Sequence, residues 1–133
     1  MFLSRGCEYA IQALLYLASR NEEGYISIRE ISENSDLSFF FLGKIIQKLS
    51  GNGLLDSYKG PNGGVKLAKK PSAISVLDVV KTIDGLDYFD RCFIGLPRCD
   101  ENNPCALHDE WQSNKTNIYK MLKNTTLALL REK

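Results

Sequence analysis

Histidine and cysteine are scarce in this chain, with one and four copies among 133 residues. The sequence has no apolar run that approaches the roughly 20 residues of a membrane span. It also has no basic start followed by an apolar stretch, as a secretion signal would have. We therefore expect a cytoplasmic protein with no membrane partner. In that reducing compartment stable disulfides are rare, so clustered cysteines more often bind metal or sense redox state.

Two further absences argue against an enzyme. The sequence contains no Cys-x-x-Cys motif of the kind found in thiol oxidoreductases, and no glycine-rich nucleotide-binding loop. Its single histidine, His108, lies among cysteines and is therefore a candidate ligand rather than a free general base. We predict a protein that is not an enzyme and has no small-molecule substrate. A small thiol oxidoreductase is the least favoured alternative.

Charge is distributed unevenly along the chain, although the formal net charge is only +1. Residues 44–70 carry six lysines against one acid, whereas residues 84–110 carry seven acids against two arginines. A basic segment of this size is expected where a protein contacts phosphates, although a solvated surface would have the same composition. With 44% hydrophobic and 25% charged residues, the chain has the composition of one soluble domain, with room for an appended element.

Three helices are predicted in the first third of the chain, each starting at a serine that can cap it: Ser4, Ser27 and Ser38. Their expected ranges are 4–24, 27–34 and 38–51. Ser27 and Glu30 match a capping box, in which each side chain bonds the backbone N–H of the other residue. The third helix carries an apolar face of Phe41, Leu42, Ile45, Ile46 and Leu49. Because a tight turn joins the second helix to the third, the pair forms a helix-turn-helix.

A β-hairpin, or wing, is predicted directly after the third helix. Residues 54–58 and 65–68 have the pattern of two short strands, and residues 60–64 have that of the tight turn between them. The expected fold class is therefore mainly α with a small β-hairpin wing, and residues 1–70 form a winged helix-turn-helix domain. Such a domain places its third helix in the major groove of DNA, while the wing touches the backbone or the minor groove.

The candidate DNA-binding residues lie on the third helix and in the wing. They are Ser38, Phe40, Lys44, Gln47, Lys48, Lys59, Gly60, Pro61, Asn62 and Gly63. Gln47 can read an adenine edge through two hydrogen bonds, and the lysines can reach phosphates or guanine acceptors. We expect Phe41 in the core, and Phe39 or Phe40 either against a thymine methyl group or over the turn.

A connecting segment at 71–90, with a helix from about residue 75 to 84, leads to a sensor loop at 91–108 and a long helix at 106–131. The apolar stripe of that long helix is the candidate dimerisation surface: Trp111, Ile118, Leu122, Thr125 and Leu129. A single long helix at the end of a small domain is marginal unless it packs on something. A second copy of the chain is the expected partner, and packing on its own domain is the alternative.

The sensor loop holds three of the four cysteines and the only histidine, spaced Cys-x6-Cys-x5-Cys-x2-His: Cys92, Cys99, Cys105 and His108. A buried-core role fits poorly, because the segment is polar and interrupted by proline and glycine. Thiolates suit iron–sulfur clusters and also zinc, although the usual Cys-x2-4-Cys knuckle of zinc sites is absent. A reversible thiol switch is the third possibility. Cys7, far from the trio, is expected to be a packed thiol, with an alternate ligand or a redox partner as less favoured roles.

Several motifs in this order resemble the Rrf2 family of bacterial transcription regulators. They are Ser4-Arg5-Gly6 followed by Tyr9-Ala10, Ile31-Ser32-Glu33, the wing Lys59-Gly60-Pro61-Asn62-Gly63-Gly64, and the helix from Val76 to Asp84. The resemblance spans nearly the whole chain. It implies a homodimeric regulator, more often a repressor, that binds a roughly palindromic DNA operator. The family members it resembles sense redox state, nitric oxide or iron status through an iron–sulfur cluster.

The resemblance also implies the ligands, with Cys92, Cys99 and Cys105 as thiolates. IscR-like members use a histidine at the position of His108 as the fourth ligand. NsrR-like and RsrR-like members use a carboxylate of the partner subunit, at the position of Glu8. The first spacing is one residue longer here than in the IscR-like pattern, but a loop rich in glycine and proline can absorb the extra residue. We therefore expect a cluster that need not have the same nuclearity, with 2Fe–2S favoured and 4Fe–4S as the alternative.

The wing departs from the family pattern at one residue. Lys59 replaces an arginine of the family's wing, which keeps the charge but loses the planar two-pronged donor. We therefore expect weaker insertion into a narrow minor groove.

Overall fold

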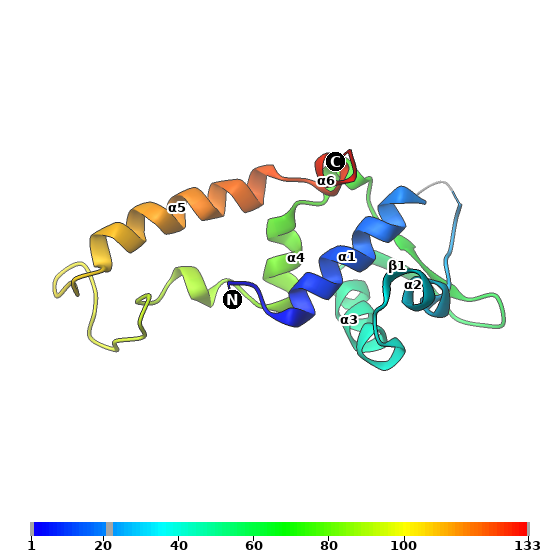
Figure 1. Cartoon of the computed structure of the whole chain (residues 1–133), viewed down its shortest axis with the longest axis horizontal. Coiled ribbons are helices and arrows are strands. Elements are labelled where there is room, and N and C mark those ends of the chain that lie inside the picture. Colours follow the sequence, from blue (N-terminus) through cyan, green and yellow to red (C-terminus); the bar gives the residue numbers. More distant parts are fainter. Residues whose placement is uncertain (1, 21–22, 133) are drawn as a thin grey trace.

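The computed structural model describes residues 2–20 and 23–132 and shows a helical body from which one long helix extends (Figure 1). The helices are α1 (Arg5–Ser19), α2 (Ile28–Ser35), α3 (Phe39–Gly51), α4 (Val76–Ile83), α5 (His108–Asn124) and α6 (Leu127–Arg131), and the strands are β1 (Leu55–Tyr58) and β2 (Gly64–Leu67). Two 3-10 turns, η1 (Pro71–Ala73) and η2 (Asp87–Phe89), flank α4. Within the described ranges, no helix is both long and apolar enough to cross a membrane. The predicted fold class is confirmed.

Serine caps start the first three helices, as predicted. The hydroxyls of Ser4, Ser27 and Ser38 each accept a hydrogen bond from the backbone N–H three residues ahead. These bonds satisfy donors that a helix start would otherwise leave unpaired, which is why the starts could be located from the sequence. The predicted end of the first helix falls partly on residues 21–22, which lie outside the described residues.

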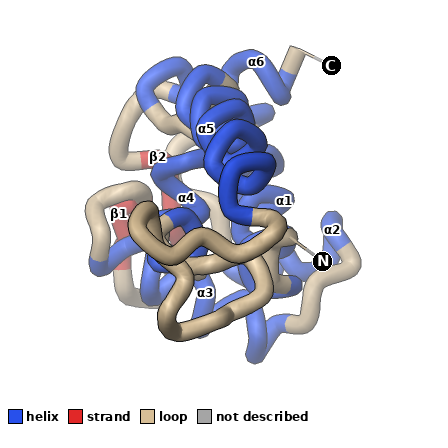
Figure 2. The backbone as a smooth tube through the Cα atoms, turned by 90° about the vertical axis from the view of Figure 1, so that its left-hand side faces the viewer, coloured by secondary structure: helices blue, strands red, loops and turns tan. Residues whose placement is uncertain are grey.

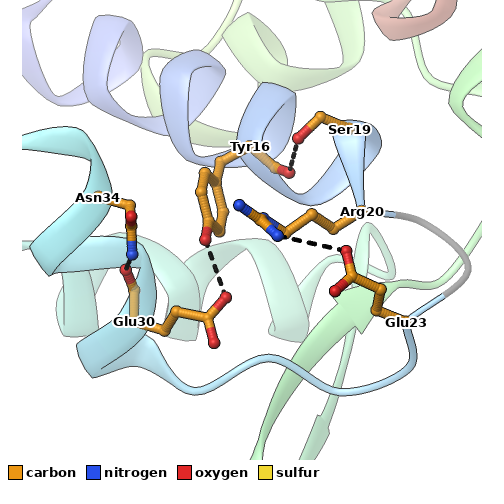
Figure 3. Close-up of polar contacts among 6 residues, drawn as sticks. All are labelled: Tyr16, Ser19, Arg20, Glu23, Glu30 and Asn34. Carbon is orange, nitrogen blue, oxygen red and sulfur yellow. Dashed lines mark hydrogen bonds and ion pairs between the residues drawn. The ribbon is translucent and has the colours of Figure 1, made fainter.

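The capping box predicted at Ser27 is only half formed. Instead of bonding back to Ser27, the Glu30 carboxylate accepts a hydrogen bond from the Tyr16 hydroxyl at 2.8 Å (Figure 3). The Arg20 guanidinium lies over the Tyr16 ring, 4.9 Å from its centroid, and pairs with Glu23 at 3.4 Å. Burial and the Glu30 contact raise the pKa of Tyr16. The glutamate therefore joins α2 to α1, because a tertiary partner takes the place of the local one.

The hairpin is antiparallel and pairs residues 55–58 with residues 64–67. It is joined to the segment before α2 by a two-bond bridge between Ile26 and Val65, with N···O distances of 2.9 and 2.8 Å. A Cβ atom at Gly64 would collide with the Ile26 carbonyl, and one at Gly63 would collide with that of Tyr58. The two glycines of the wing motif are therefore required by close backbone approach.

The core lies between α1, α3, α4 and the hairpin. Its largest fully buried side chains are Leu14, Ile31, Leu42, Leu49, Ile74, Leu127, Val65, Val79 and Cys7. Four of the five apolar residues predicted for the inner face of α3 are buried, but Phe41 is 38% exposed. Its ring lies at the edge of that face, 5.4 Å from Tyr9 in an edge-on contact. The expectation of a core position for Phe41 was therefore wrong.

The segment predicted as one helix over 106–131 is divided into α5 and α6. Thr125 is extended, and its carbonyl accepts from the Val76 N–H at 2.8 Å, while the Leu127 N–H donates to Ile74 at 2.9 Å. Thr126 then caps α6 with its side chain. Backbone pairing with the strand-like residues before α4 breaks the helix, and α6 packs against α1 and η1 (Figure 1). α6 therefore packs on its own domain, whereas the first turns of α5 extend away from it (Figure 1).

Candidate metal centre and DNA-binding surface

The sensor loop between η2 and α5 consists of successive tight turns. The Gly95 N–H donates to the Cys92 carbonyl at 3.0 Å, and the Cys99 N–H donates to Leu96 at 3.3 Å. Gly95 has φ +77°, a conformation that favours glycine. In Figure 2 the loop folds back beneath the first turn of α5. Cysteines that are separated by six and by five intervening residues are thereby brought to one place.

The sulfur atoms of Cys92, Cys99 and Cys105 all lie within 4.8 Å of one another. Those of Cys92 and Cys105 are 3.8 Å apart, and none of the three forms a disulfide. Two thiolates on one tetrahedral metal with bonds of about 2.3 Å lie about 3.8 Å apart. The three half-buried thiols therefore fit a thiolate-bound metal centre, whether iron–sulfur or zinc.

Local hydrogen bonding lowers the pKa of one of these thiols, which favours the thiolate that binds metal. The backbone N–H of Leu96 is the main cause that lowers the pKa of Cys92 to about 7, against the opposing effect of burial. At Cys99 the Cys105 N–H favours the thiolate, but burial and the neighbouring sulfurs raise the pKa on balance. Because metals bind the thiolate, Cys92 is more available than Cys99 near neutral pH, and binding at Cys99 releases a proton.

The two candidates for the fourth ligand lie in different places. His108 begins α5, and its Nδ1 is 3.4 Å from the Cys99 sulfur, yet it is not part of the group whose ligand atoms all lie within 4.8 Å. Glu8 is half-buried on α1, and no group of ligand atoms in the described residues joins it to the cysteines. The identity of the fourth ligand stays a prediction, with His108 nearer within one chain.

Cys7 lies apart from this centre, completely buried in the core on α1. Burial is the main cause that raises its pKa to about 12, and the carboxylates of Asp84 and Glu8 add to the effect. A thiol that stays protonated in an apolar core is a poor ligand and a poor nucleophile. The structure therefore agrees with the expectation of a packed thiol.

Cys7 should contribute to a loss of stability in alkali. Because its folded pKa exceeds its ordinary value of 9.0, the contribution is fully present below about pH 9 and is lost as the pH rises towards 12. The free energy of unfolding of Cys7→Ala, measured by urea titration between pH 7 and pH 10.5, should fall less steeply above pH 9 than that of the wild type. Identical slopes for the two proteins would contradict this assignment.

The predicted DNA-binding residues lie on the exposed face of α3 and in the wing. All ten are exposed except Gly63, which is partly covered. Between α3 and the hairpin lies a groove of about 690 Å³, lined by Gln47, Lys59 and Gly60 among others. Lys44 and Lys48 line a separate cavity of about 730 Å³ on the other side of α3.

Two aromatic contacts beside this surface were not foreseen from the sequence. Arg29 of α2 lies over the ring of Phe39, 4.9 Å from its centroid, and Lys66 of β2 lies 4.8 Å from that of Tyr25. Arg29 and Phe39 both line the groove. Arg29 falls outside the basic segment 44–70, so a charge count along the sequence could not include it.

The residues predicted for dimerisation have different surroundings. Trp111 and Leu122 are buried within the chain and Ile118 is half-buried, whereas Leu129 is 49% exposed and Thr125 is partly covered. Tyr119 and Met121 of α5 are also exposed apolar residues that the stripe did not include. The apolar surface left for a partner is therefore narrower than the stripe and lies partly on other residues.

The comparisons with known proteins agree with this geometry. Residues 3–133 match the model of the Rrf2 family, described as an iron-dependent transcriptional regulator. The HTH-type transcriptional regulator IscR of Yersinia pseudotuberculosis is 35% identical over 130 residues, which cover 98% of this chain and 79% of that protein.

Two solved structures share the fold over almost the whole chain. One is CymR, the global cysteine regulator of B. subtilis, with a TM-score of 0.83 and 25% identity, covering 99% of this chain and 97% of that one. The other is T. potens IscR, with a TM-score of 0.80 and 28% identity, covering 99% of this chain and 87% of that one. Because both regulators have this fold, the cysteines rather than the fold must indicate the cofactor.

Proposed function

Because this chain belongs to the Rrf2 family of transcription regulators, we propose that it is a homodimeric repressor that senses redox, nitric oxide or iron status through a bound iron–sulfur cluster. The observation that carries the proposal is the convergence of three free thiols in a loop beside α5, within 4.8 Å of one another. A metal centre uses all three thiols at once, whereas a reversible thiol switch pairs only two of them. The proposed ligands are Cys92, Cys99 and Cys105, with His108 or the partner's Glu8 as the fourth.

A bound cluster would supply a centre that responds to oxidation, to nitric oxide or to iron loss. Each response would change the conformation of the loop residues that hold it. The chain's own residues tie that loop to the helices. The Trp111 indole donates to the Arg91 carbonyl at 3.1 Å, and the Lys115 ammonium donates to that of Phe89 at 2.6 Å. Any change in the loop's turns therefore acts on α5 and on η2 directly.

A path of aromatic contacts continues from the loop towards the DNA-binding domain. Trp111 meets Tyr88 edge-on at 5.9 Å between ring centroids, and Tyr88 meets Phe2 at 4.8 Å. Next to Phe2, the backbone and hydroxyl of Ser4 donate to the carboxylate of Asp84, which joins the start of α1 to the end of α4. These contacts support a coupling between the loop and the orientation of α1 against α3.

A second candidate function is that of a zinc-dependent regulator of the same fold. It is favoured by the 3.8 Å spacing of the Cys92 and Cys105 sulfurs, which suits one tetrahedral zinc as well as iron. The DNA-binding part of the proposal is the same in both cases. Counting iron, sulfide and zinc per chain separates them.

Two substitutions on the proposed DNA surface should have different effects. Lys59→Ala should weaken binding to all sequences about equally and lower the slope of log affinity against log salt by about one. Gln47→Ala should cost about 1–3 kcal/mol on the preferred operator alone and relax the sequence preference, because it removes a base contact. Fluorescence anisotropy, with duplexes selected from a random library, measures both at several salt concentrations.

Lys120→Ala on α5 is the matched control, since it removes one exposed lysine far from α3 along the chain. It should leave both affinity and salt slope unchanged. The proposed function fails if the wild-type protein, with or without its metal, forms no salt-sensitive and sequence-selective complex with DNA.

A further inference from the structure

A glycine inside α3 has no structural reason within the chain. Gly43 is the fifth residue of the helix, its φ is not in the left-handed region, and a Cβ atom built on it meets nothing within 4 Å. Alanine would therefore fit without strain. Glycine inside a helix lowers the folding equilibrium constant roughly two- to fivefold relative to alanine. The fold therefore gains nothing from this glycine, and the space beside it is open to a contact from outside the chain.

The position of Gly43 on the helix indicates which contact that is. Phe40 is three residues before it and Gln47 is four residues after it, so the three residues lie on one side of α3. Phe40 is 84% exposed, the most exposed of the large hydrophobic residues in the described part of the chain. Gly43 and Gln47 both line the groove between α3 and the wing. The backbone of Gly43, which carries no side chain, therefore lies between the exposed ring of Phe40 and the side-chain amide of Gln47, next to the wing.

Phe39, the residue before Phe40, packs against the exposed ring of Phe40. Phe39 lies under the Arg29 guanidinium and meets Phe40 edge-on, with 6.0 Å between ring centroids. Phe40 thus has a packed neighbour on one side and open space towards Gly43. Phe40 and Gly43 therefore lie one turn apart near the start of the helix, which is the part of a recognition helix that contacts base edges.

We propose that Gly43 and Phe40 receive the C5 methyl group of a thymine in the major groove, an inference that rests on the proposed DNA-binding function. The thymine methyl is the one apolar group on a base edge there, and apolar side chains recognise it by contact. A Cβ atom at position 43 would occupy the space that the methyl group needs. Gln47 on the same side would read a neighbouring adenine.

Uracil tests this directly, because it differs from thymine only by that methyl group. The probe is the tightest duplex that the wild-type protein selects from a random library, with each thymine replaced singly by uracil. For the wild type, one replacement per half-site should weaken binding by at least about fivefold. Gly43→Ala should bind the thymine duplex about as weakly as the wild type binds that uracil duplex, and should no longer respond to the replacement. Phe40→Ala should also lose the response.

Stability provides an independent readout that separates this role from a folding defect. Gly43→Ala should raise the melting temperature by about 2–4 °C while it weakens DNA binding. Gly51→Ala, the same change at the other end of α3 with open space around it, should keep the wild-type affinity and its response to uracil. The inference is overturned if the wild type binds its selected duplex but no uracil replacement changes the affinity, or if Gly43→Ala keeps the response. If the wild type selects no sequence, the proposed function itself fails.

Discussion

Replacing Cys99 by alanine should abolish metal binding, with the metal per chain falling from near stoichiometric to background. The Cys99 sulfur accepts from the Cys105 N–H at 3.5 Å and lies 3.4 Å from His108 Nδ1, so it is central to the site. Removing a ligand should exceed the roughly 10- to 100-fold loss of metal affinity that follows loss of a supporting partner. Anaerobic purification, an absorption spectrum, and counts of iron, sulfide and zinc measure the effect.

Cys7→Ala is the control, because it removes a thiol that is buried away from the loop. It should keep the spectrum and the metal count of the wild type. A Cys99→Ala protein with full metal content would place the centre elsewhere. A colourless wild-type protein with stoichiometric zinc would replace the cluster by the zinc alternative.

The same measurement on His108→Ala and Glu8→Ala assigns the fourth ligand. The variant that lacks the true ligand should lose or destabilise the chromophore, and the other should retain it. The Glu8 result also reports on assembly, since that residue would have to reach the cysteines of a second subunit.

Replacing Trp111 by alanine should lower the free energy of unfolding by about 3–5 kcal/mol and weaken metal retention at the same time. Trp111 is 7% exposed, and its ring lies 5.9 Å from that of Tyr88 and 5.1 Å from that of Phe93. Its indole N–H also holds the Arg91 carbonyl next to Cys92. The substitution therefore leaves a cavity and frees the start of the sensor loop. Urea unfolding and metal counts on the same preparations measure both effects.

Two matched variants separate packing from the hydrogen bond. Trp111→Phe keeps most of the ring contact and should cost less than the alanine variant, with the lost bond contributing about 1 kcal/mol. Gln112→Ala, at an exposed polar residue of the same helix, should stay within about 0.5 kcal/mol of the wild type. If Trp111→Ala were no more destabilising than Gln112→Ala, Trp111 would not hold the loop.

The features that the sequence predicted correctly depend on local chemistry. Serine caps at Ser4, Ser27 and Ser38 start the helices whatever the rest of the chain does, and the glycines of the wing fit a tight turn in which a larger residue would clash. The gathering of three cysteines was also predictable, because a short loop with glycine and proline brings its residues together. In each case the signal and its partner are close in the sequence.

The features that the sequence missed depend on distant partners. Glu30 bonds to Tyr16 across two helices, and the break at Thr125 arises from backbone pairing with residues nearly fifty positions earlier. The apolar stripe runs through that break, so periodicity favoured one continuous helix. The exposure of Phe41 likewise depends on a distant partner, since its ring meets Tyr9 of α1 at the edge of the packed face. The role proposed for Gly43 could not be predicted for another reason, because only the structure shows that no atom lies close to the position of a Cβ there.

The position of α6 in the core determines when the domain can complete its folding during synthesis. Leu127 is completely buried in the core of the DNA-binding domain, and Arg131 donates to the carbonyl of Ala18 at 3.1 Å. A nascent chain still held in the ribosome at these positions lacks part of that core, even though α1 to β2 have long since emerged. The domain is therefore completed only after the cysteine loop has been translated.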